Sequence, residues 1–380
     1  MKSVCVLGST GSIGRQTLEV ADELGIRVSG LAAGSNVDLL CEQVIKFRPD
    51  FVSIEDVSCV ETLNARIRSD EYEPEILCGR AGLEELIINV ESDVVLNAIV
   101  GFAGLEPTVA AIKAGKDVAL ANKESLVAAG DLITSEARRM GVSVRPVDSE
   151  HSAIWQCLFG EDPENVDRLV LTASGGPFRD RADLSNVTPE EAVKHPNWHM
   201  GRKISVDSAT LMNKALEVIE ASRLFKVDAY DIKVVVHRES VVHSWVEFAD
   251  GSCKAQFGMP DMRVPIQLAL TFPKRLHGAV KAPDMVKIGR LSFEEPDRKR
   301  FPAVEFGHYA LERGGVVPAV LSAANEAAVD AFLKGHIGFM QISRLVEEAM
   351  DKCENVSDPS LEDILISDRW AREFVIRRCI

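Results

Sequence analysis

Ser3-Val-Cys-Val-Leu7 runs directly into Gly8-Ser-Thr-Gly-Ser-Ile-Gly14, and a helical pattern follows to about Leu24. An apolar run that ends in a glycine loop and opens an amphipathic helix predicts the start of a dinucleotide-binding fold. Gly8, Gly11 and Gly14 would let the backbone approach a pyrophosphate, which the amides and dipole of the helix start favour. A plain tight turn is the alternative, but the strand and helix around this loop favour the nucleotide.

The same alternation of strand and helix continues through the first half of the chain. Further apolar runs, each followed by a helical pattern, lie at Ile26 to Ala33, Phe51 to Ile54, Glu75 to Cys78, Asp93 to Val100 and Asp117 to Ala121. Such alternation predicts a doubly wound parallel sheet, whose ligand site lies at the carboxyl ends of the strands.

The end of the second predicted strand bears on the choice of nucleotide. NAD-preferring sites usually place an Asp or Glu about 20 residues after the glycines, where it binds the ribose hydroxyls. Here the strand ends Leu31-Ala-Ala-Gly-Ser-Asn36, with no carboxylate to repel a phosphate. We therefore favour NADP, with Ser35 and Asn36 as neutral donors to the 2'-phosphate, although either residue could simply cap the next helix.

Two carboxylates of Asp148-Ser149-Glu150 follow the strand-like run Val142 to Val147. Because a strand turns residues i and i+2 to the same side, both would face one point. Such a pair either coordinates a hard divalent cation or does general acid/base work. A helix N-cap is the commoner role of acidic residues after a strand.

Glu217, on the helical pattern Ser208 to Leu224, is the candidate third carboxylate. The predicted buried stripe is Leu211, Ala215, Val218 and Ser222, and the opposite face carries Asn213, Lys214, Glu217 and Glu220. Three carboxylates and a lysine could converge, although such a face is more often solvated. Asp207 or Ser208 would cap this helix, and its positive start, with Ser208 and Lys214, suits a phosphate monoester.

Residues 175–204 hold glycines, prolines and one short helical piece, which is typical of a mobile lid. The segment contains His195-Pro-Asn-Trp198-His-Met-Gly201. A histidine beside an aromatic residue in a glycine-flanked loop favours ligand contact, whereas Trp198 could equally anchor the loop to the domain surface. Lys123 follows the sixth predicted strand at the edge of the crevice, where it could also be an ordinary surface charge.

The second half of the chain changes from strands to helices. Val234 to His237 predicts a strand, and Val241 to Ala249 with Ser252 to Gly258 predicts a hairpin with a two-residue turn at Asp250-Gly251. From about Leu291 the pattern is mainly helical, with clear periods at Ala303 to Arg313, Val317 to Leu333 and Gln341 to Cys353. We expect a supporting role for this last region.

Composition excludes several classes of protein. The 380 residues, 46% hydrophobic, suffice for two or three domains with sizeable cores. The net charge of -15 argues against nucleic acid or an anionic membrane as the main partner. Eight scattered cysteines without zinc-site spacing favour free thiols in a reducing cytoplasm. Met1 runs straight into the first strand and no apolar run reaches membrane-spanning length, so we expect neither a signal peptide nor a membrane span.

Several long strings, in order along essentially the whole chain, resemble the 1-deoxy-D-xylulose 5-phosphate reductoisomerase family. They are Gly8-Ser-Thr-Gly-Ser-Ile-Gly14, Ala121-Asn-Lys-Glu-Ser125, Pro146-Val-Asp-Ser-Glu-His151, Ser174-Gly-Gly-Pro-Phe178, His195-Pro-Asn-Trp198, Met200-Gly-Arg-Lys-Ile-Ser-Val-Asp-Ser-Ala-Thr210, Met212-Asn-Lys214 with Glu217, and Ala323-Ala-Asn-Glu326. The resemblance implies an NADPH- and divalent-metal-dependent conversion of 1-deoxy-D-xylulose 5-phosphate to 2-C-methyl-D-erythritol 4-phosphate, in the non-mevalonate isoprenoid pathway.

The resemblance also implies roles for individual residues. Asp148, Glu150 and Glu217 would bind Mg²⁺ or Mn²⁺, and with Lys123 and His195 they are the catalytic candidates. The other residues implied to contact substrate are Ser149, Ser174, Ser208, Asn213 and Lys214, the last four at its phosphate end, with Trp198 and Met200 in the lid. The residues implied to bind NADPH are Gly8, Thr10, Gly11, Ser12, Ile13, Gly14, Gly34, Ser35, Asn36, Asn122, Glu124 and Gly201. His243 would follow the family's Ser-x-x-His string, which begins at Ser240.

The resemblance implies an overall organisation as well. The fold class would be an α/β N-terminal domain with a doubly wound, Rossmann-like parallel sheet, an α+β catalytic domain and a C-terminal four-helix bundle, in a homodimer of V-shaped subunits. The expected boundaries are 1–147 for NADPH binding, 148–285 for catalysis and dimerisation with the lid at about 175–204, and 286–380 for the helical domain.

The chain departs from the family pattern at two places. Ser35 stands where members often carry a basic residue, which weakens the ionic contact with the 2'-phosphate. Arg238-Glu239 replaces the usual Pro-Gln between His237 and Ser240, a change whose effect the sequence does not explain.

Two other functions remain open on the sequence. One is a simple NADP-dependent ketone dehydrogenase, and the other is a catalytically dead nucleotide-sensing protein. The intact carboxylates and Lys214 favour turnover over the second.

Overall fold

The computed structural model describes residues 2–68, 72–195, 198 and 200–379, which fall into two compact units. Unit 1 comprises Met1–Asn122, Ile133–Ser149 and Asp261–Lys281, and unit 2 comprises Lys123–Leu132, Glu150–Pro260 and Ala282–Ile380. The predicted division into three domains stays a prediction, since segments from the middle of the chain belong to both units.

Unit 1 is built on a parallel sheet of seven strands, in the order β4-β3-β2-β1-β5-β6-β7. The strands are β1 (Ser3–Leu7), β2 (Arg27–Ala33), β3 (Phe51–Ile54), β4 (Glu75–Cys78), β5 (Val94–Asn97), β6 (Asp117–Leu120) and β7 (Val144–Pro146). The predicted doubly wound sheet is confirmed. Strand order reverses between β4 and β5, so β1 and β5 flank the switch point at which such sheets bind ligands.

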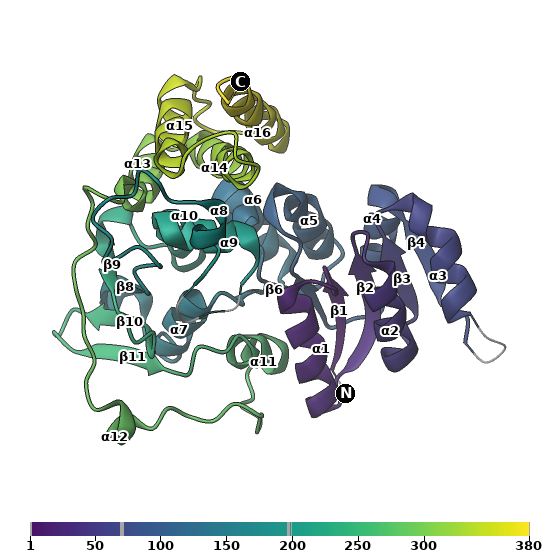
Figure 1. Ribbon diagram of the computed structural model, residues 1–380. Helices are drawn as coiled ribbons and strands as arrows, with labels where there is room; N and C mark the ends of the chain where they lie inside the picture. The colour runs from purple at the N-terminus through teal and green to yellow at the C-terminus, as the bar shows by residue number, and fades with distance from the viewer. Residues whose placement is uncertain (1, 69–71, 196–197, 199, 380) are drawn as a thin grey trace. The chain divides into compact units, whose positions relative to one another are not determined.

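Helices lie on both faces of this sheet (Figure 1), which is why its strands are almost continuously apolar. They are α1 (Ser12–Leu24), α2 (Val37–Phe47), α3 (Val60–Ile67), α4 (Gly79–Asn89), α5 (Leu105–Lys113) and α11 (Arg263–Thr271), with 3-10 turns at Val57–Cys59 and Gly101–Gly104. The helix α6 (Lys123–Met140) supplies residues to both units, and Ala129 interrupts it with φ −138° and ψ 31°.

Unit 2 contains a mixed sheet of four strands in the order β11-β10-β8-β9. The strands are β8 (Val166–Ala173), β9 (Ile232–Val236), β10 (Val242–Phe248) and β11 (Cys253–Phe257), with β8 and β9 parallel and the other pairs antiparallel. The predicted hairpin is confirmed as β10 and β11. Its turn occupies 249–252, so the predicted two-residue turn is wrong.

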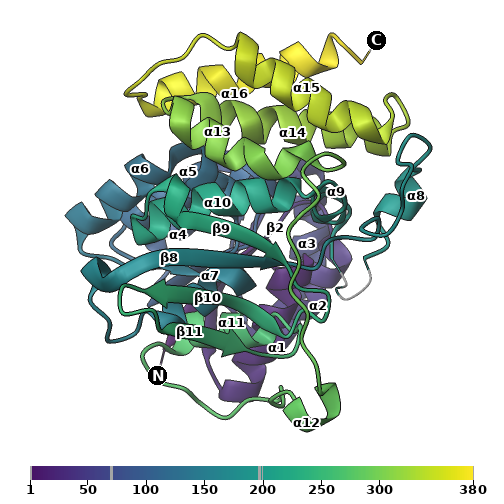
Figure 2. The same ribbon diagram turned by 90° about the vertical axis from the view of Figure 1, so that its left-hand side faces the viewer.

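Helices build successive layers on one face of this sheet (Figure 2). The helices after β7 are α7 (Ser149–Cys157), α8 (Pro189–Ala192), α9 (Arg202–Thr210), α10 (Met212–Phe225), α12 (Met285–Ile288), α13 (Phe306–Arg313), α14 (Val317–Leu333), α15 (Phe339–Lys352) and α16 (Leu361–Ile376), with 3-10 turns at Pro163–Asn165, Ala229–Asp231 and Pro302–Glu305. Of these, α12 lies apart from the layers. From the sheet outward come α10, then α13 and α14, then α15 and α16. The predicted bounds of α14 are confirmed, whereas periodicity did not reveal α16.

The predicted single helix Ser208 to Leu224 is wrong, because Leu211 adopts the left-handed conformation (φ 60°) and separates α9 from α10. Ser208 therefore lies in the last turn of α9, and Asp207 lies inside that helix. Neither residue caps α10, whose N-cap is Leu211. A leucine with positive φ is uncommon, so nothing in the apolar period marks this break.

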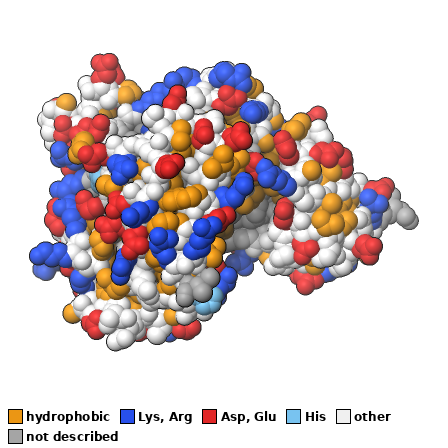
Figure 3. Space-filling model, turned by 90° about the horizontal axis from the view of Figure 1, so that it is seen from above, with side chains coloured by type: hydrophobic (Ala, Val, Ile, Leu, Met, Phe, Trp, Pro, Cys, Tyr) orange, Lys and Arg blue, Asp and Glu red, His pale blue; other side chains and the backbone are white. Residues whose placement is uncertain are grey.

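All eight cysteines are free, as predicted. Among the described residues, no helix is long and apolar enough to cross a membrane. On the face drawn in Figure 3, acidic and basic side chains of the described residues are intermingled rather than gathered into a broad patch of one sign.

Candidate active site

Two lysines and two glutamates meet inside unit 2. Lys214, in the first turn of α10, places its Nζ 2.5 Å from Glu150 Oε1 and 2.5 Å from Glu217 Oε2. Lys123, the first residue of α6, donates to Glu217 Oε1 at 3.1 Å. The side chains of Lys123 and Lys214 are 6% exposed and that of Glu217 is 1% exposed, so the expectation of a solvated face or a surface lysine is wrong.

Asn213 completes the contacts around Glu217. Its Oδ1 accepts from Lys123 Nζ at 2.9 Å, and its Nδ2 donates to Glu217 Oε1 at 2.5 Å. Both oxygens of Glu217 are thus held, one by Lys123 and Asn213 and the other by Lys214. Removing one partner of such a buried group leaves an uncompensated charge, at about 3–5 kcal/mol.

Asp148 joins this cluster through the chain itself, since it stands two residues before Glu150 at the start of α7. One carboxylate oxygen from each of Asp148, Glu150 and Glu217 lies within 4.8 Å of the others. The predicted convergence is found, but the strand argument for it is wrong: β7 ends at Pro146, and Ser149 already begins α7. Three carboxylates with no sulfur or nitrogen donor form a set that suits a hard cation such as Mg²⁺.

A neutral imidazole lies near this cluster. The backbone N–H of Trp198 donates to His195 Nδ1 at 3.0 Å, so the ring proton is on Nε2 and donates to Ser174 Oγ at 2.9 Å. Burial first, then the charges of Arg179 and Lys214, lower the pKa of His195 to about 4. His195 is therefore a hydrogen-bond donor at neutral pH, not a cation.

Trp198 packs against the buried His243, with ring centroids 6.1 Å apart. Burial also lowers the pKa of His243. The contact agrees with the anchoring role considered for Trp198, and Met200 beside it is half-buried. Positions 196, 197 and 199 of the predicted lid lie outside the described residues.

The loop after β8 approaches the end of α9 closely. A Cβ at Gly176 (φ 69°) would stand 2.7 Å from Ser208 O, so only glycine lets the loop pack there. The N–H of Gly176 also donates to Ser174 Oγ at 3.2 Å. The close packing brings the loop that carries Ser174 beside Ser208, two of the residues predicted to hold the phosphate.

In unit 1 the glycine loop has the predicted form. It joins β1 to α1, and Gly11 caps that helix without any side-chain hydrogen bond, which leaves the first-turn amides for a ligand. A Cβ at Gly14 would stand 2.3 Å from Gly8 O, so the loop folds back closely on itself.

Other residues predicted to bind the nucleotide have structural contacts of their own. Asn36 Oδ1 accepts from Leu39 N at 3.2 Å, so the helix-cap alternative is confirmed for Asn36. Ser35 and Gly34 before it are exposed. Asn122 donates to the carbonyls of Ile99 and Gly101, each at 2.7 Å. These contacts do not test whether Asn36 and Asn122 bind NADPH, so both roles stay predictions.

Several polar contacts were not predicted from the sequence. His151 Nε2 bonds Glu217 O at 3.0 Å, and its Nδ1 lies 3.5 Å from Glu220 Oε2, behind the carboxylate cluster. Lys203 pairs with Glu124 and Asp207. Only the i,i+4 spacing of Lys203 and Asp207 could have been noticed beforehand.

The Arg238-Glu239 departure now has an explanation. Arg238 contacts Glu294 at 2.8 Å and Asp180 at 3.0 Å, and Glu239 accepts from Ser292 Oγ at 2.8 Å. Arg238 and Glu239 therefore connect the loop after β9 to residues 292–294. Glu294 of this segment also forms an isolated β-bridge with Val236 of β9.

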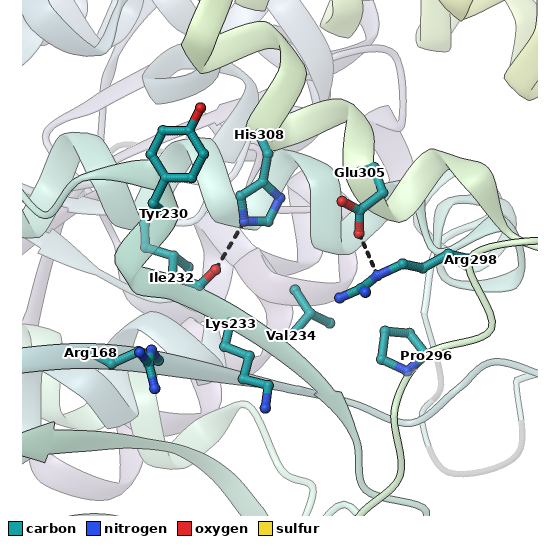
Figure 4. A pocket seen from close by; sticks show the side chains of 9 residues that line it. All are labelled: Arg168, Tyr230, Ile232, Lys233, Val234, Pro296, Arg298, Glu305 and His308. Carbon is teal, nitrogen blue, oxygen red and sulfur yellow. Dashed lines mark hydrogen bonds and ion pairs between the residues drawn. The ribbon is translucent and has the colours of Figure 1, made fainter.

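An open pocket of about 430 Å³ lies in unit 2, and Figure 4 shows the side chains that line it. Its lining residues are Arg168, Tyr230, Ile232, Lys233, Val234, Pro296, Arg298, Glu305 and His308. Its cations are already paired, Arg168 with Glu247 at 3.2 Å, Lys233 with Glu295 at 3.3 Å and Arg298 with Glu305 at 2.8 Å. The residues predicted for catalysis do not line this pocket.

Comparison with known proteins gives matches along the whole chain. The family model described as 1-deoxy-D-xylulose 5-phosphate reductoisomerase matches residues 4–130, and two models of reductoisomerase C-terminal domains match 144–225 and 257–374. A 1-deoxy-D-xylulose 5-phosphate reductoisomerase of Symbiobacterium thermophilum is 52% identical over 98% of this chain and 97% of its own length. One of Pelotomaculum thermopropionicum is 51% identical over 99% and 98%.

Solved structures agree with these matches. The reductoisomerase from Zymomonas mobilis in complex with NADPH has a TM-score of 0.92 at 42% identity, covering 100% of this chain and 99% of that one. A DOX-P reductoisomerase in complex with NADPH, fosmidomycin and magnesium has a TM-score of 0.94 at 39% identity, covering 100% and 98%.

His195 should titrate as a buried neutral imidazole. Because its folded pKa of about 4 lies below the ordinary 6.5, the unfolded chain binds more protons between these values. The stability contributed by His195 is therefore present above about pH 6.5 and is lost as the pH falls towards 4.

Long-range ¹H–¹⁵N NMR on histidine-labelled protein should show the Nε2–H tautomer at pH 7 and a midpoint near 4. His195→Gln should flatten the pH dependence of the unfolding free energy over this window. A His195 signal that titrates near 6.5, or the Nδ1–H tautomer at pH 7, would contradict the assignment.

Proposed function

We propose that this chain, which belongs to the 1-deoxy-D-xylulose 5-phosphate reductoisomerase family, converts 1-deoxy-D-xylulose 5-phosphate to 2-C-methyl-D-erythritol 4-phosphate with NADPH. The chain is an NADPH-dependent oxidoreductase of isoprenoid precursor biosynthesis. The observation that carries this conclusion is the sequence identity of 52% and 51%, over nearly the full length of both chains, to relatives of that name. The cluster of Glu150, Glu217, Lys123 and Lys214 in unit 2 supports it independently.

The reaction explains why such a cluster is needed. Rearranging an α-hydroxyketone breaks and remakes a carbon–carbon bond through oxyanionic species, and the aldehyde that forms must be reduced before it escapes. A bound Mg²⁺ or Mn²⁺ supplies Lewis-acid stabilisation of adjacent substrate oxygens. Asp148, Glu150 and Glu217 are the proposed ligands, supported by their mutual approach within 4.8 Å.

The lysines have a separate role in this proposal. Lys123 and Lys214 balance the charge of Glu217 and donate to oxygens around it. Both lysines are ion-paired and buried, so they place positive charge directly beside the carboxylates proposed to bind the cation. Lys123 is proposed to lie near the reacting oxygens, and Lys214 to serve the substrate phosphate.

The proposed substrate contacts come from several helices and the loops between them. Ser174 and His195 are joined by a hydrogen bond of 2.9 Å and offer neutral groups to the substrate. Ser208 lies in the last turn of α9 and Asn213 in the first turn of α10, so these two residues flank the break at Leu211. Ser149 opens α7 beside Glu150, and Trp198 and Met200 belong to the segment proposed as a lid.

For the cofactor we propose NADPH on the loop that contains Gly8 to Gly14, with its 2'-phosphate near Ser35 and Asn36. Exposed Ser35 and the missing carboxylate support this choice. Glu124 and Gly201 can take part only through backbone atoms or indirectly, since Glu124 is already paired with Lys203 and Gly201 has no side chain. A nucleotide there would supply hydride to the aldehyde.

We further propose a cytoplasmic homodimer with the three domains named above. The free thiols agree with a reducing compartment. The strand β11 is the edge of its sheet, with exposed Cys253, Lys254 and Ala255. Phe257 is 44% exposed and Met259 is 43% exposed beside it. An exposed edge strand with apolar neighbours suits pairing with a second copy of the chain.

Purified protein with substrate, NADPH and Mg²⁺ should consume NADPH and yield a branched product by NMR. An unbranched diol would favour a simple ketone dehydrogenase, and no turnover would favour a nucleotide-sensing protein.

In the same assay Glu217→Gln should lose activity by about 100-fold or more. The substitution removes a proposed ligand of the cation, and the cation stabilises the transition state by several kcal/mol. Mn²⁺ binding followed by electron paramagnetic resonance should weaken in parallel. The matched control Glu347→Gln, on exposed α15 surface, should behave as wild type. Full activity of Glu217→Gln would refute the metal assignment.

Ser35→Arg should strengthen the preference for NADPH over NADH. A charge-assisted hydrogen bond to the 2'-phosphate is worth about 1.5–3 kcal/mol, so the ratio of kcat/KM values should rise roughly 10-fold or more. Ser35→Ala serves as the control without the new charge. An unchanged ratio in Ser35→Arg would show that the 2'-phosphate lies elsewhere.

Sedimentation should give the mass of a dimer for the wild type. Phe257→Glu combined with Met259→Glu should shift the mass to that of a monomer, because two charges would be buried against the partner. The control Tyr230→Glu, at a residue 77% exposed, should leave the dimer intact. A monomeric wild type would remove the dimer proposal, and an unaffected double variant would remove β11 from the interface.

A further inference from the structure

A buried network of ion pairs runs from the start of α6 to the C-terminal helices of unit 2. Lys203 Nζ lies 2.7 Å from Glu124 Oε1 and 2.8 Å from Asp207 Oδ2. The side chain of Asp207 is 1% exposed, that of Glu124 9% and that of Lys203 19%. Asp207 is thus a buried charge held by a partner one turn earlier on its own helix.

Two residues of α14 extend this network. Asn325 is fully buried and donates from Nδ2 to Asp207 Oδ1 at 2.8 Å. Glu326 next to it accepts from Arg372 of α16 at 2.8 Å, and Arg372 also binds Asp368 at 2.8 Å. Both carboxylate oxygens of Asp207 are therefore engaged, one by Lys203 and one by a C-terminal helix.

Electrostatic interactions link the ion pairs around Lys203 to the ion pair between Glu326 and Arg372. Burial alone would lower the pKa of Lys203, but Asp207, Glu124 and Glu326 together raise it above its ordinary value. Burial raises the pKa of Glu326, and the charges of Lys203 and Arg372 oppose this. Lys203 is therefore a fixed cation that feels charges from α6, α9 and α14.

Two residues of the network are sequence neighbours of residues in the proposed active site. Asp207 precedes Ser208, and Glu124 follows Lys123. Beyond Ser208 the chain turns at Leu211 into the part of α10 that carries Asn213 and Lys214. A shift of α9 would therefore move Ser208 and reorient the start of α10.

We propose that Asp207, Lys203 and Asn325 are positioning residues, which hold α9 at the orientation needed to bind the phosphate end of the substrate. The C-terminal helices then serve the reaction through Asn325 and Glu326, beyond supporting the fold. The inference rests on the proposed function, because it assumes that Ser208, Asn213 and Lys214 receive a phosphate.

The test compares Asp207→Asn with an exposed pair of the same spacing. Asp330 on α14 and Lys334, which caps the C-terminus of that helix, also form an i,i+4 pair at 2.7 Å, but their side chains are 61% and 59% exposed. Asp207→Asn should raise the KM for substrate about 10-fold, with kcat changed less than about 3-fold, because losing the charge of Asp207 weakens the contacts that hold α9 and so displaces the residues proposed to bind the phosphate. Asp330→Asn should leave both constants unchanged.

Inorganic phosphate as a competitive inhibitor gives a second readout at the phosphate end. Its inhibition constant should rise in Asp207→Asn in parallel with KM. The dissociation constant of NADPH, measured by fluorescence without substrate, should stay within about 2-fold of wild type. Lys203→Arg keeps both ion pairs and should retain wild-type KM, whereas Lys203→Met should resemble Asp207→Asn.

If Asp207→Asn fails to fold, Asn325→Ala decides, because it removes one hydrogen bond and leaves the Lys203–Asp207 pair. A folded variant whose melting temperature falls while KM and phosphate inhibition stay unchanged would show a purely structural network and overturn the proposal. A wild type that does not turn over the substrate would instead overturn the proposed function.

Discussion

The arrangement of unit 2 depends on charge balance in a buried place. Glu217 is fully buried, and a lone carboxylate there would protonate or destabilise the fold. Lys123 and Lys214 prevent this, but they come from different helices and are themselves buried. Neither helix can therefore move without leaving a charge unpaired. A site that must bind a divalent cation and a phosphate gains from this, because its ligands are held in place before either arrives.

Much of the fold could be predicted because its strongest signals are local. Strands covered on both faces are continuous apolar runs, so the sequence predicts β1 and β3 with the bounds that the structure has. The bounds of the more exposed edge strand β4 agree as well. The helices α1 and α14 were similarly clear. The predictions that are wrong concern junctions between secondary-structure elements. The left-handed Leu211 and the start of α7 at Ser149 depend on packing around them, and the apolar period carries no sign of either.

The site shows the same division between residue identity and geometry. Asp148, Glu150, Glu217 and Lys214 could be selected from residue type and order, and they do come together. Residue type and order do not predict the structural elements that bring these residues together. Residues 149–157 form a helix, so the strand rule does not describe them. The face of α10 that the sequence predicts to be solvated is largely buried, and its charges pair there with Glu150 of α7 and Lys123 at the start of α6. Pairing across many residues has no local pattern, so only structure reveals it.

The C-terminal helices show why a supporting role is hard to separate from a functional one. The apolar period of α14 describes how it packs between α13, α15 and α16. It says nothing of Asn325 and Glu326, polar residues within the same helix that point to a charged partner on α9 or α16. A polar group in a core is unfavourable unless it is paired, so its presence there indicates a constraint other than packing. In this chain the constraint is the orientation of α9, whose last turn contains Ser208, a residue proposed to contact substrate.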